Sequence, residues 1–185
     1  MILGDIAIRE YLGQGKGVIG FKPENINPNS VDLTLNSEMS VYANRILDCR
    51  QKNEVEKIEM TSEGFVLIPN VIYLATTNET LDLKTSLKFE AKKHICARVE
   101  GKSSLGRLGL FIHITAGWID AGFKGSLVLE LTVVQPLRIY PNMKICQISF
   151  MESTEVEKHY GEKEGSKYQN QIGAQESKMH ENFKK

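Results

Sequence analysis

Glu130 is the residue of this sequence that most suggests chemistry, because it interrupts the apolar run Leu127–Val134. Burying a carboxylate is costly unless it is paired or belongs to a site. Alternate residues of a strand point to opposite faces, so Val128 and Glu130 should share a face, with Leu129 on the other. We expect Glu130 to point into a cavity or an interface and to serve there as a general acid and base. A place on the solvated face of an edge strand is an equally good interpretation.

A second candidate is the segment Glu100–Arg107, which follows an apolar run and looks like a turn into a short helix. Lys102, Ser103 and Ser104 would lie at the helix start, where free backbone N–H groups favour anions. Arg107 would follow one turn later on the same face. The segment lacks the first glycine of a P-loop. The spacing predicts a compact phosphate-binding site, with a serine-capped surface helix as the alternative.

The third candidate is the glycine-rich segment Thr115–Gly125, in which three glycines surround Asp120. This composition predicts a tight β-hairpin whose backbone approaches another group closely. Asp120 could bond a ligand hydroxyl, hold a water or bind a metal, although aspartate is also an ordinary turn residue. We expect Trp118, the only tryptophan, to lie in the core.

Zinc chemistry is not expected from this sequence. The four histidines are scattered, and the three cysteines form no CxxC pair. The histidine, glutamate and cysteine pattern of zinc enzymes that deaminate bases is missing. Any such reaction here must activate water without zinc.

The elements that must position these residues are mostly strands. Short apolar or alternating runs are separated by glycine, asparagine or proline, which predicts an all-β sandwich, barrel or jelly roll. One short helix is expected at residues 5–13. The expected strands cover residues 30–35, 65–69, 71–75, 95–99, 110–114, 127–134 and 145–150.

Charge and composition exclude several classes of partner. Lys plus Arg and Asp plus Glu both number 23, so no net field draws the chain to nucleic acid or to an anionic membrane. No apolar stretch approaches the length of a membrane span. The N-terminus lacks a signal peptide pattern, and we expect a cytoplasmic location.

The composition changes after Phe150. We expect a β domain at residues 1–150 and a separate tail at 151–185, which is rich in Glu, Lys, Gln and Ser. Composition alone favours a solvated tail. The polar cluster Gly165–Gly173 also fits a flexible lid that closes over a polar ligand.

These segments occur together in one family. The sequence resembles the dCTP deaminases from about residue 2 to residue 177, in order and with matching spacing. The resemblance implies a dUTPase-like β fold, a distorted jelly roll or barrel that assembles as a homotrimer with active sites between subunits. The matching segments are Pro28–Leu33, Gly101–Leu110, Thr115–Phe123, Leu127–Glu130 and Gly165–Gln171.

The resemblance also implies roles for individual residues. Glu130 would be the catalytic carboxylate, with Ser103 and Arg107 placing the water, and Asp120 would contact the deoxyribose or serve a second hydrolysis. Magnesium would be held by the triphosphate and water rather than by the protein, and dTTP would be a feedback inhibitor. The implied nucleotide-binding set is Lys102, Ser103, Ser104, Leu105, Gly106, Arg107, Ala116, Asp120, Val128, Leu129, Glu130, Gln147, Tyr160, Lys167 and Gln171.

The residues and the resemblance together leave four functions to compare. The main prediction is hydrolytic deamination of dCTP to dUTP and ammonia. The alternative is a bifunctional enzyme that also releases pyrophosphate and forms dUMP, because Thr115–Asp120 matches the hairpin of such members. A pure dUTPase fits less well, since those enzymes usually carry an apolar residue in place of Glu130. A nucleotide-sensing module without catalysis would not need that carboxylate.

Overall fold

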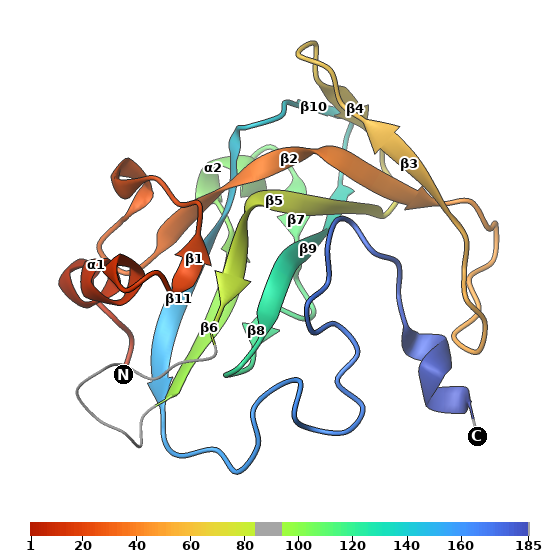
Figure 1. Ribbon diagram of the computed structural model, residues 1–185. Helices are drawn as coiled ribbons and strands as arrows, with labels where there is room; N and C mark the ends of the chain where they lie inside the picture. The colour runs from red at the N-terminus through yellow and green to blue at the C-terminus, as the bar shows by residue number, and fades with distance from the viewer. Residues whose placement is uncertain (84–93, 185) are drawn as a thin grey trace.

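The computed structural model describes residues 1–83 and 94–184. Within these ranges the chain is mainly β, as predicted, and every strand pair is antiparallel. The nine-stranded sheet has the order β7-β9-β5-β2-β11-β6-β8, with β1 added to β5 and β3 added to β2. Figure 1 shows this sheet curling around the core, with β4 and β10 as a separate two-stranded ribbon at the top.

Helices are few and short in the described chain. They are α1 (Asp5–Gly13), α2 (Ser103–Gly106) and the 3-10 turns η1 (Pro23–Asn25) and η2 (Met179–Phe183). The first strands are β1 (Gly17–Ile19), β2 (Val31–Tyr42), β3 (Val55–Glu59), β4 (Phe65–Leu67) and β5 (Tyr73–Asp82). The remaining strands are β6 (His94–Gly101), β7 (Leu110–Ile112), β8 (Trp118–Ile119), β9 (Lys124–Val133), β10 (Leu137–Ile139) and β11 (Lys144–Ser153).

The predicted helix at residues 5–13 is confirmed, and each predicted strand finds a counterpart. The strand predicted at 110–114 stops at Ile112 because His113 has a φ of 51°. That left-handed conformation is incompatible with a continuing strand.

The predicted hairpin at residues 115–125 is wrong. The strands on either side of its turn do not pair with each other: β8 pairs with β6, and β9 pairs with β5 and β7. The segment therefore connects the edge strand β8 to β9, which lies next to the opposite edge strand, β7. The expected close approach is present, because a Cβ on Gly122 would lie 2.5 Å from the Cβ of His159.

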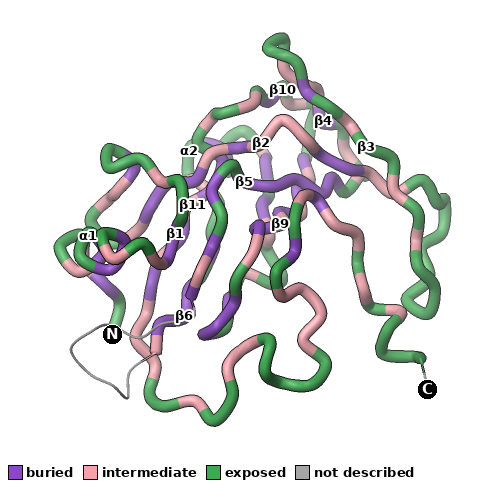
Figure 2. Tube along the Cα trace, viewed as in Figure 1, coloured by how far each residue is buried: buried purple, intermediate pink, exposed green. Residues whose placement is uncertain are grey.

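The core is built by the alternation of the long inner strands. Along β9, Leu127, Leu129 and Leu131 are buried, while Val128 and Glu130 are only partly covered. Figure 2 shows the buried positions concentrated along β2, β5, β6 and β11. The face assignment predicted for β9 is correct.

The tail after β11 lies on the rest of the chain rather than apart from it. Ser126 N–H donates to the Gln171 carbonyl, and Asn170 N–H donates to the Lys124 carbonyl, at 2.9 and 2.7 Å. These bonds lay the tail against the start of β9, as Figure 1 shows for the blue segment. The described chain contains no helix long and apolar enough to cross a membrane.

Candidate active site

A cavity of about 500 Å³ lies between β9, the loop from β7 to β8, and the tail. This is within the range of small-molecule sites. Its lining combines apolar and aromatic side chains with a few polar groups, which suits a nucleoside. The lining residues are Tyr42, Ile72, Leu74, His113, Ala116, Trp118, Ile119, Asp120, Phe123, Leu127, Val128, Glu130, Tyr160, Tyr168, Gln171, Gln175, Glu176 and Ser177.

Glu130 faces this cavity from the middle of β9, and its side chain is 35% exposed. Its Oε2 lies 3.0 Å from His113 Nδ1, an ion-pair distance, although that nitrogen has no aligned hydrogen bond. Strand β7 ends just before His113, whose backbone N–H donates to the Glu130 carbonyl at 2.9 Å. The other ring nitrogen of His113 lies 2.7 Å from the Ala116 carbonyl oxygen. The histidine therefore ties the catalytic candidate to the loop that carries Ala116.

His113 was missed by the sequence analysis, which found no motif among the histidines. In the sequence it lies within the strand predicted at residues 110–114, and the pairing of β7 with β9, which brings it beside Glu130, is visible only in the structure. Its left-handed backbone turns the ring toward the cavity, and this cannot be predicted from residue type.

Asp120 also lines the cavity, directly after β8. Trp118 Nε1–H donates to Asp120 Oδ1 at 3.1 Å. The prediction that Trp118 lies in the core is wrong, because Trp118 is 56% exposed and lines the cavity. Strand β8 is only two residues long and its inward position is taken by Ile119, so Trp118 points outward. Three carboxylates line the cavity: Glu130 and Asp120 each have one nearby ring nitrogen, and Glu176 pairs with Lys52.

The tail closes one side of the cavity. Gln171 is almost fully buried and its side-chain amide donates to the Ser126 carbonyl at 2.8 Å, while Tyr160 N–H donates to the Ala121 carbonyl. Lys167 does not line the cavity, and its carbonyl accepts from Lys178 Nζ.

Tyr42, at the end of β2, joins the cavity to the tail and was not anticipated. Its hydroxyl accepts from Ser177 N–H at 3.0 Å. Burial, together with the charges of Glu176 and Glu130, raises the pKa of this phenol above its ordinary value. Tyr42 therefore remains a neutral hydrogen-bonding group in the physiological range.

The remaining predicted residues lie elsewhere. Leu129 is buried in the core on the opposite face of β9. None of the residues from Lys102 to Arg107 is among the described residues that line the cavity. Within that segment Leu105 is buried, and the exposed members are Ser103, Ser104, Gly106 and Arg107.

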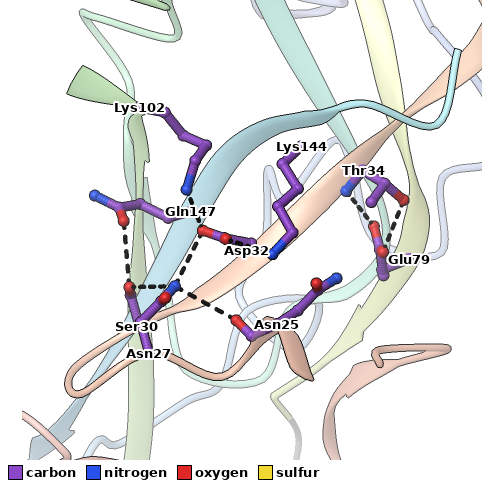
Figure 3. A network of polar contacts seen from close by, with 9 residues as sticks. All are labelled: Asn25, Asn27, Ser30, Asp32, Thr34, Glu79, Lys102, Lys144 and Gln147. Atoms are coloured by element: carbon purple, nitrogen blue, oxygen red, sulfur yellow. Dashed lines mark hydrogen bonds and ion pairs between the residues drawn. The ribbon is translucent and has the colours of Figure 1, made fainter. Parts of the chain in front are cut away.

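Lys102 and Gln147 belong to a second polar group, which we call the Asp32 cluster (Asn27, Ser30, Asp32, Lys102, Lys144 and Gln147). Figure 3 shows these side chains converging from β2 and the loop before it, from β11, and from the segment before α2. Both Lys102 and Lys144 make ion pairs with Asp32. Burial alone would raise the pKa of Asp32, but the hydrogen bonds from the two lysines hold it below its ordinary value. Members of both polar groups were therefore predicted from the sequence, but Asp32, the carboxylate that organises the second group, was not.

Metal ligation by the protein has little support in the described residues. No group of three or more His, Cys, Asp or Glu side chains gathers there in a metal-binding arrangement. The donors that are present, lysines and amides, suit phosphate oxygens rather than a bare cation.

Comparison with known proteins supports the resemblance. Residues 2–153 match the family described as dCTP deaminase-like. The protein named "dCTP deaminase, dUMP-forming" of Clostridium botulinum (strain Alaska E43 / Type E3) is 43% identical over 185 residues, which is 100% of both chains. The protein of the same name from Leptospira biflexa serovar Patoc is 36% identical, over 100% of this chain and 99% of that one.

The fold has a counterpart among solved structures. The crystal structure of 2'-deoxycytidine 5'-triphosphate deaminase from Agrobacterium tumefaciens superposes with a TM-score of 0.61 at 24% identity. The match covers 80% of this chain and 47% of that chain. This chain belongs to the dCTP deaminase-like family.

Proposed function

We propose that this protein is a dUMP-forming dCTP deaminase, which converts dCTP to dUMP, ammonia and pyrophosphate. The observation that carries the proposal is the presence of Glu130 and Asp120 in one cavity. Full-length relatives at about 40% identity carry the dUMP-forming name. They favour this outcome, the alternative weighed from the sequence, over release of dUTP.

Deamination is assigned to Glu130. Its carboxylate takes a proton from a water whose oxygen attacks C4 of cytosine and passes it to N3 as the C4–N3 double bond opens. The remaining hydroxyl proton then passes through the same carboxylate to the amino group, which leaves as ammonia as the C4 carbonyl forms. One water is consumed and one ammonia leaves. His113, 3.0 Å away, holds the carboxylate, and its other nitrogen fixes the Ala116 carbonyl beside the cytosine site.

Hydrolysis of the triphosphate is assigned to Asp120. It would activate a second water for attack at the α-phosphate, so that pyrophosphate leaves and dUMP remains. The bond from Trp118 Nε1 orients one oxygen of Asp120 and leaves the other for that water.

The phosphates would be held by Lys102, Ser103, Ser104, Arg107 and Gln147, which do not line the Glu130 cavity of the same chain. We therefore propose a homotrimer in which the segment before and through α2 of one subunit completes the cavity of the next. Exposed apolar side chains near α2 and β7 support such a contact: Leu108, Phe111, Ile114 and Val134.

Magnesium would accompany the triphosphate, bound by phosphate oxygens and water. When bound, it neutralises phosphate charge. This donor set, which has cationic, hydroxyl and amide groups and no carboxylate, fits a nucleotide that brings its own cation.

The test is an assay of dCTP and of dUTP with magnesium that scores ammonia, pyrophosphate, dUTP and dUMP. We expect ammonia and pyrophosphate in equal amounts from dCTP. Accumulation of dUTP would show a deaminase alone, and pyrophosphate from dUTP without ammonia from dCTP would show a dUTPase. In Asp120→Asn, pyrophosphate release should fall by about 10²-fold or more, and unchanged release would remove Asp120 from that step.

A further inference from the structure

Asp32 is an almost fully buried carboxylate on β2 that the proposed chemistry does not use. Its side chain is 5% exposed. Oδ1 accepts from Asn27 Nδ2 at 3.0 Å and from Lys102 Nζ, and Oδ2 lies 3.2 Å from Lys144 Nζ. Figure 3 shows the three donors arriving from different sides. Both oxygens of the carboxylate are therefore directed at fixed partners.

The charge of this cluster does not balance. One carboxylate meets two ammonium groups, which leaves one positive charge in excess. Glu79 is nearby in Figure 3 and keeps its own charge, with both oxygens accepting from Thr34. Among the described residues the ion pair of Lys144 is with Asp32, so the excess concerns the direct pairing at Asp32. One ammonium group already gives the carboxylate a counter-charge, and its remaining lone pairs require hydrogen-bond donors rather than a second charge. The second lysine is unexplained by the stability of Asp32.

Lys144 reaches the cluster through an irregularity in β11. Regular alternation would put Lys144 and Gln147 on opposite faces. The register shifts between Lys144, which pairs with Thr34, and Cys146, which pairs with Leu33. Such bulges re-aim side chains and are frequent beside active sites. Here the shift turns Lys144 toward the face that already carries Gln147.

The cluster is connected to two residues expected at the triphosphate. Lys102 shares Asp32 with Lys144. Gln147 accepts from the Ser30 hydroxyl at 3.2 Å, and Asn27 Nδ2 lies between Ser30 and Asp32. The side chain of Lys144 is 45% exposed, so part of it stays open to a ligand while it pairs with Asp32.

We propose that Lys144 is a second cation for the polyphosphate of the nucleotide, and that Asp32 is a positioning residue that holds Lys102 and Lys144 at a fixed separation. The site takes a polyphosphate, with the surplus charge of the cluster directed at the oxygens beyond the α-phosphate. This inference rests on the proposed function, because it places Lys144 at the same triphosphate as Lys102.

The experiment compares Lys144→Met, Lys144→Arg and Lys57→Met by dCTP deamination. Lys57 is a matched control, since it is 76% exposed and pairs with a single carboxylate, Glu38, at 3.3 Å. We expect Lys144→Met to raise KM for dCTP about tenfold, which corresponds to the loss of one charge-assisted hydrogen bond to the ligand. We expect kcat to stay within about twofold of the value for the unsubstituted protein. Lys144→Arg should restore most of the loss, and Lys57→Met should change neither constant.

An unchanged KM in Lys144→Met, or an equal change in Lys57→Met, overturns the proposal. A lowered melting temperature with normal KM assigns Lys144 to stability and overturns it as well. The positioning role of Asp32 is tested by repeating Lys144→Met in an Asp32→Asn background. If the same tenfold ratio persists there, Asp32 does not position the lysine.

Direct binding separates this inference from the proposed function. Calorimetry with magnesium tripolyphosphate should show weaker binding to Lys144→Met than to the unsubstituted protein. If dCTP yields no ammonia but this difference is seen, the proposed function fails and the polyphosphate site stands. If deamination occurs and tripolyphosphate binds both proteins equally, the polyphosphate site fails alone.

Discussion

Glu130 and Asp32 are two carboxylates on inner strands of the same sheet, and they differ in exposure and in the number of their partners. Asp32 is 5% exposed and is met by three side-chain donors. Glu130 is 35% exposed, faces a cavity and has one imperfectly aligned partner, His113. A carboxylate that must exchange protons needs free acceptor positions, whereas one that only holds cations is best saturated. The difference in pairing therefore separates a reacting group from a positioning group.

The largest effect expected from this comparison is on Glu130. Glu130→Gln keeps the size of the side chain but removes proton transfer, so kcat for deamination should fall by about 10³-fold or more. Calorimetry should still detect dCTP binding. Glu56→Gln, at an exposed position of β3, is the control and should leave kcat unchanged. Full activity in Glu130→Gln would place the reacting carboxylate elsewhere.

The position of Glu130 in its strand could be predicted from the sequence, whereas the burial of Asp32 could not. A glutamate within a leucine-rich strand is conspicuous in the sequence, and β9 indeed places it opposite the buried leucines. Asp32 sits in an alternating segment, so it resembled the polar face of an ordinary half-buried strand. Its burial depends on Lys102, 70 residues away in sequence, and no local pattern encodes that distance.

The pairing of the strands was the second feature that could not be predicted from the sequence. Glycines around Asp120 predicted a hairpin, but turn chemistry does not say which strands pair. Ile119 pairs with Ala97 of β6 instead. The close approaches that require Gly122 and Gly125 involve His159 and Gln171 of the tail, which composition alone favoured as solvated.

The next prediction concerns stability at Asp32. Asp32→Asn leaves two ammonium groups without their common acceptor, and the free energy of unfolding should fall by about 3 kcal/mol. Urea unfolding at pH 7 measures it. Glu38→Gln, which removes one partner of an exposed pair, should cost less than about 1 kcal/mol. Equal losses in both variants would show that the burial of Asp32 does not matter.

The same contribution should depend on pH. Because the pKa of Asp32 is held below its ordinary value, the folded state favours the charged form. The stabilisation is complete above the unfolded pKa of about 3.9 and is lost as pH falls through the lower folded pKa. The difference in unfolding free energy between the unsubstituted protein and Asp32→Asn should therefore be constant from pH 7 to about pH 5 and shrink below about pH 4. A difference that stays constant to pH 2 contradicts the assignment.

A smaller effect is expected where the tail meets the Glu130 cavity. Gly122 has a φ of 93°, and a Cβ there would lie 2.5 Å from the Cβ of His159. Gly122→Ala should cost about 2 kcal/mol and should make the tail easier to cleave in limited proteolysis. Gly20→Ala is the matched control, since Gly20 has a φ of 85° and a Cβ at that position would meet no atom within 4 Å. If both variants expose the tail equally, backbone strain rather than tail contact explains the effect.

The smallest effect is expected at the ion pair between the tail and the loop after β2. Lys52 Nζ lies 3.1 Å from Glu176 Oε1, but the lysine side chain is 68% exposed. Exposed pairs contribute little, so Lys52→Met should change the free energy of unfolding by less than about 0.5 kcal/mol and leave KM for dCTP unchanged. The tail is held instead by backbone bonds, such as the one from Ser126 N–H to the Gln171 carbonyl. A large rise in KM in Lys52→Met would mean that the solvent-exposed pair, and not this backbone pairing, keeps the tail over the cavity.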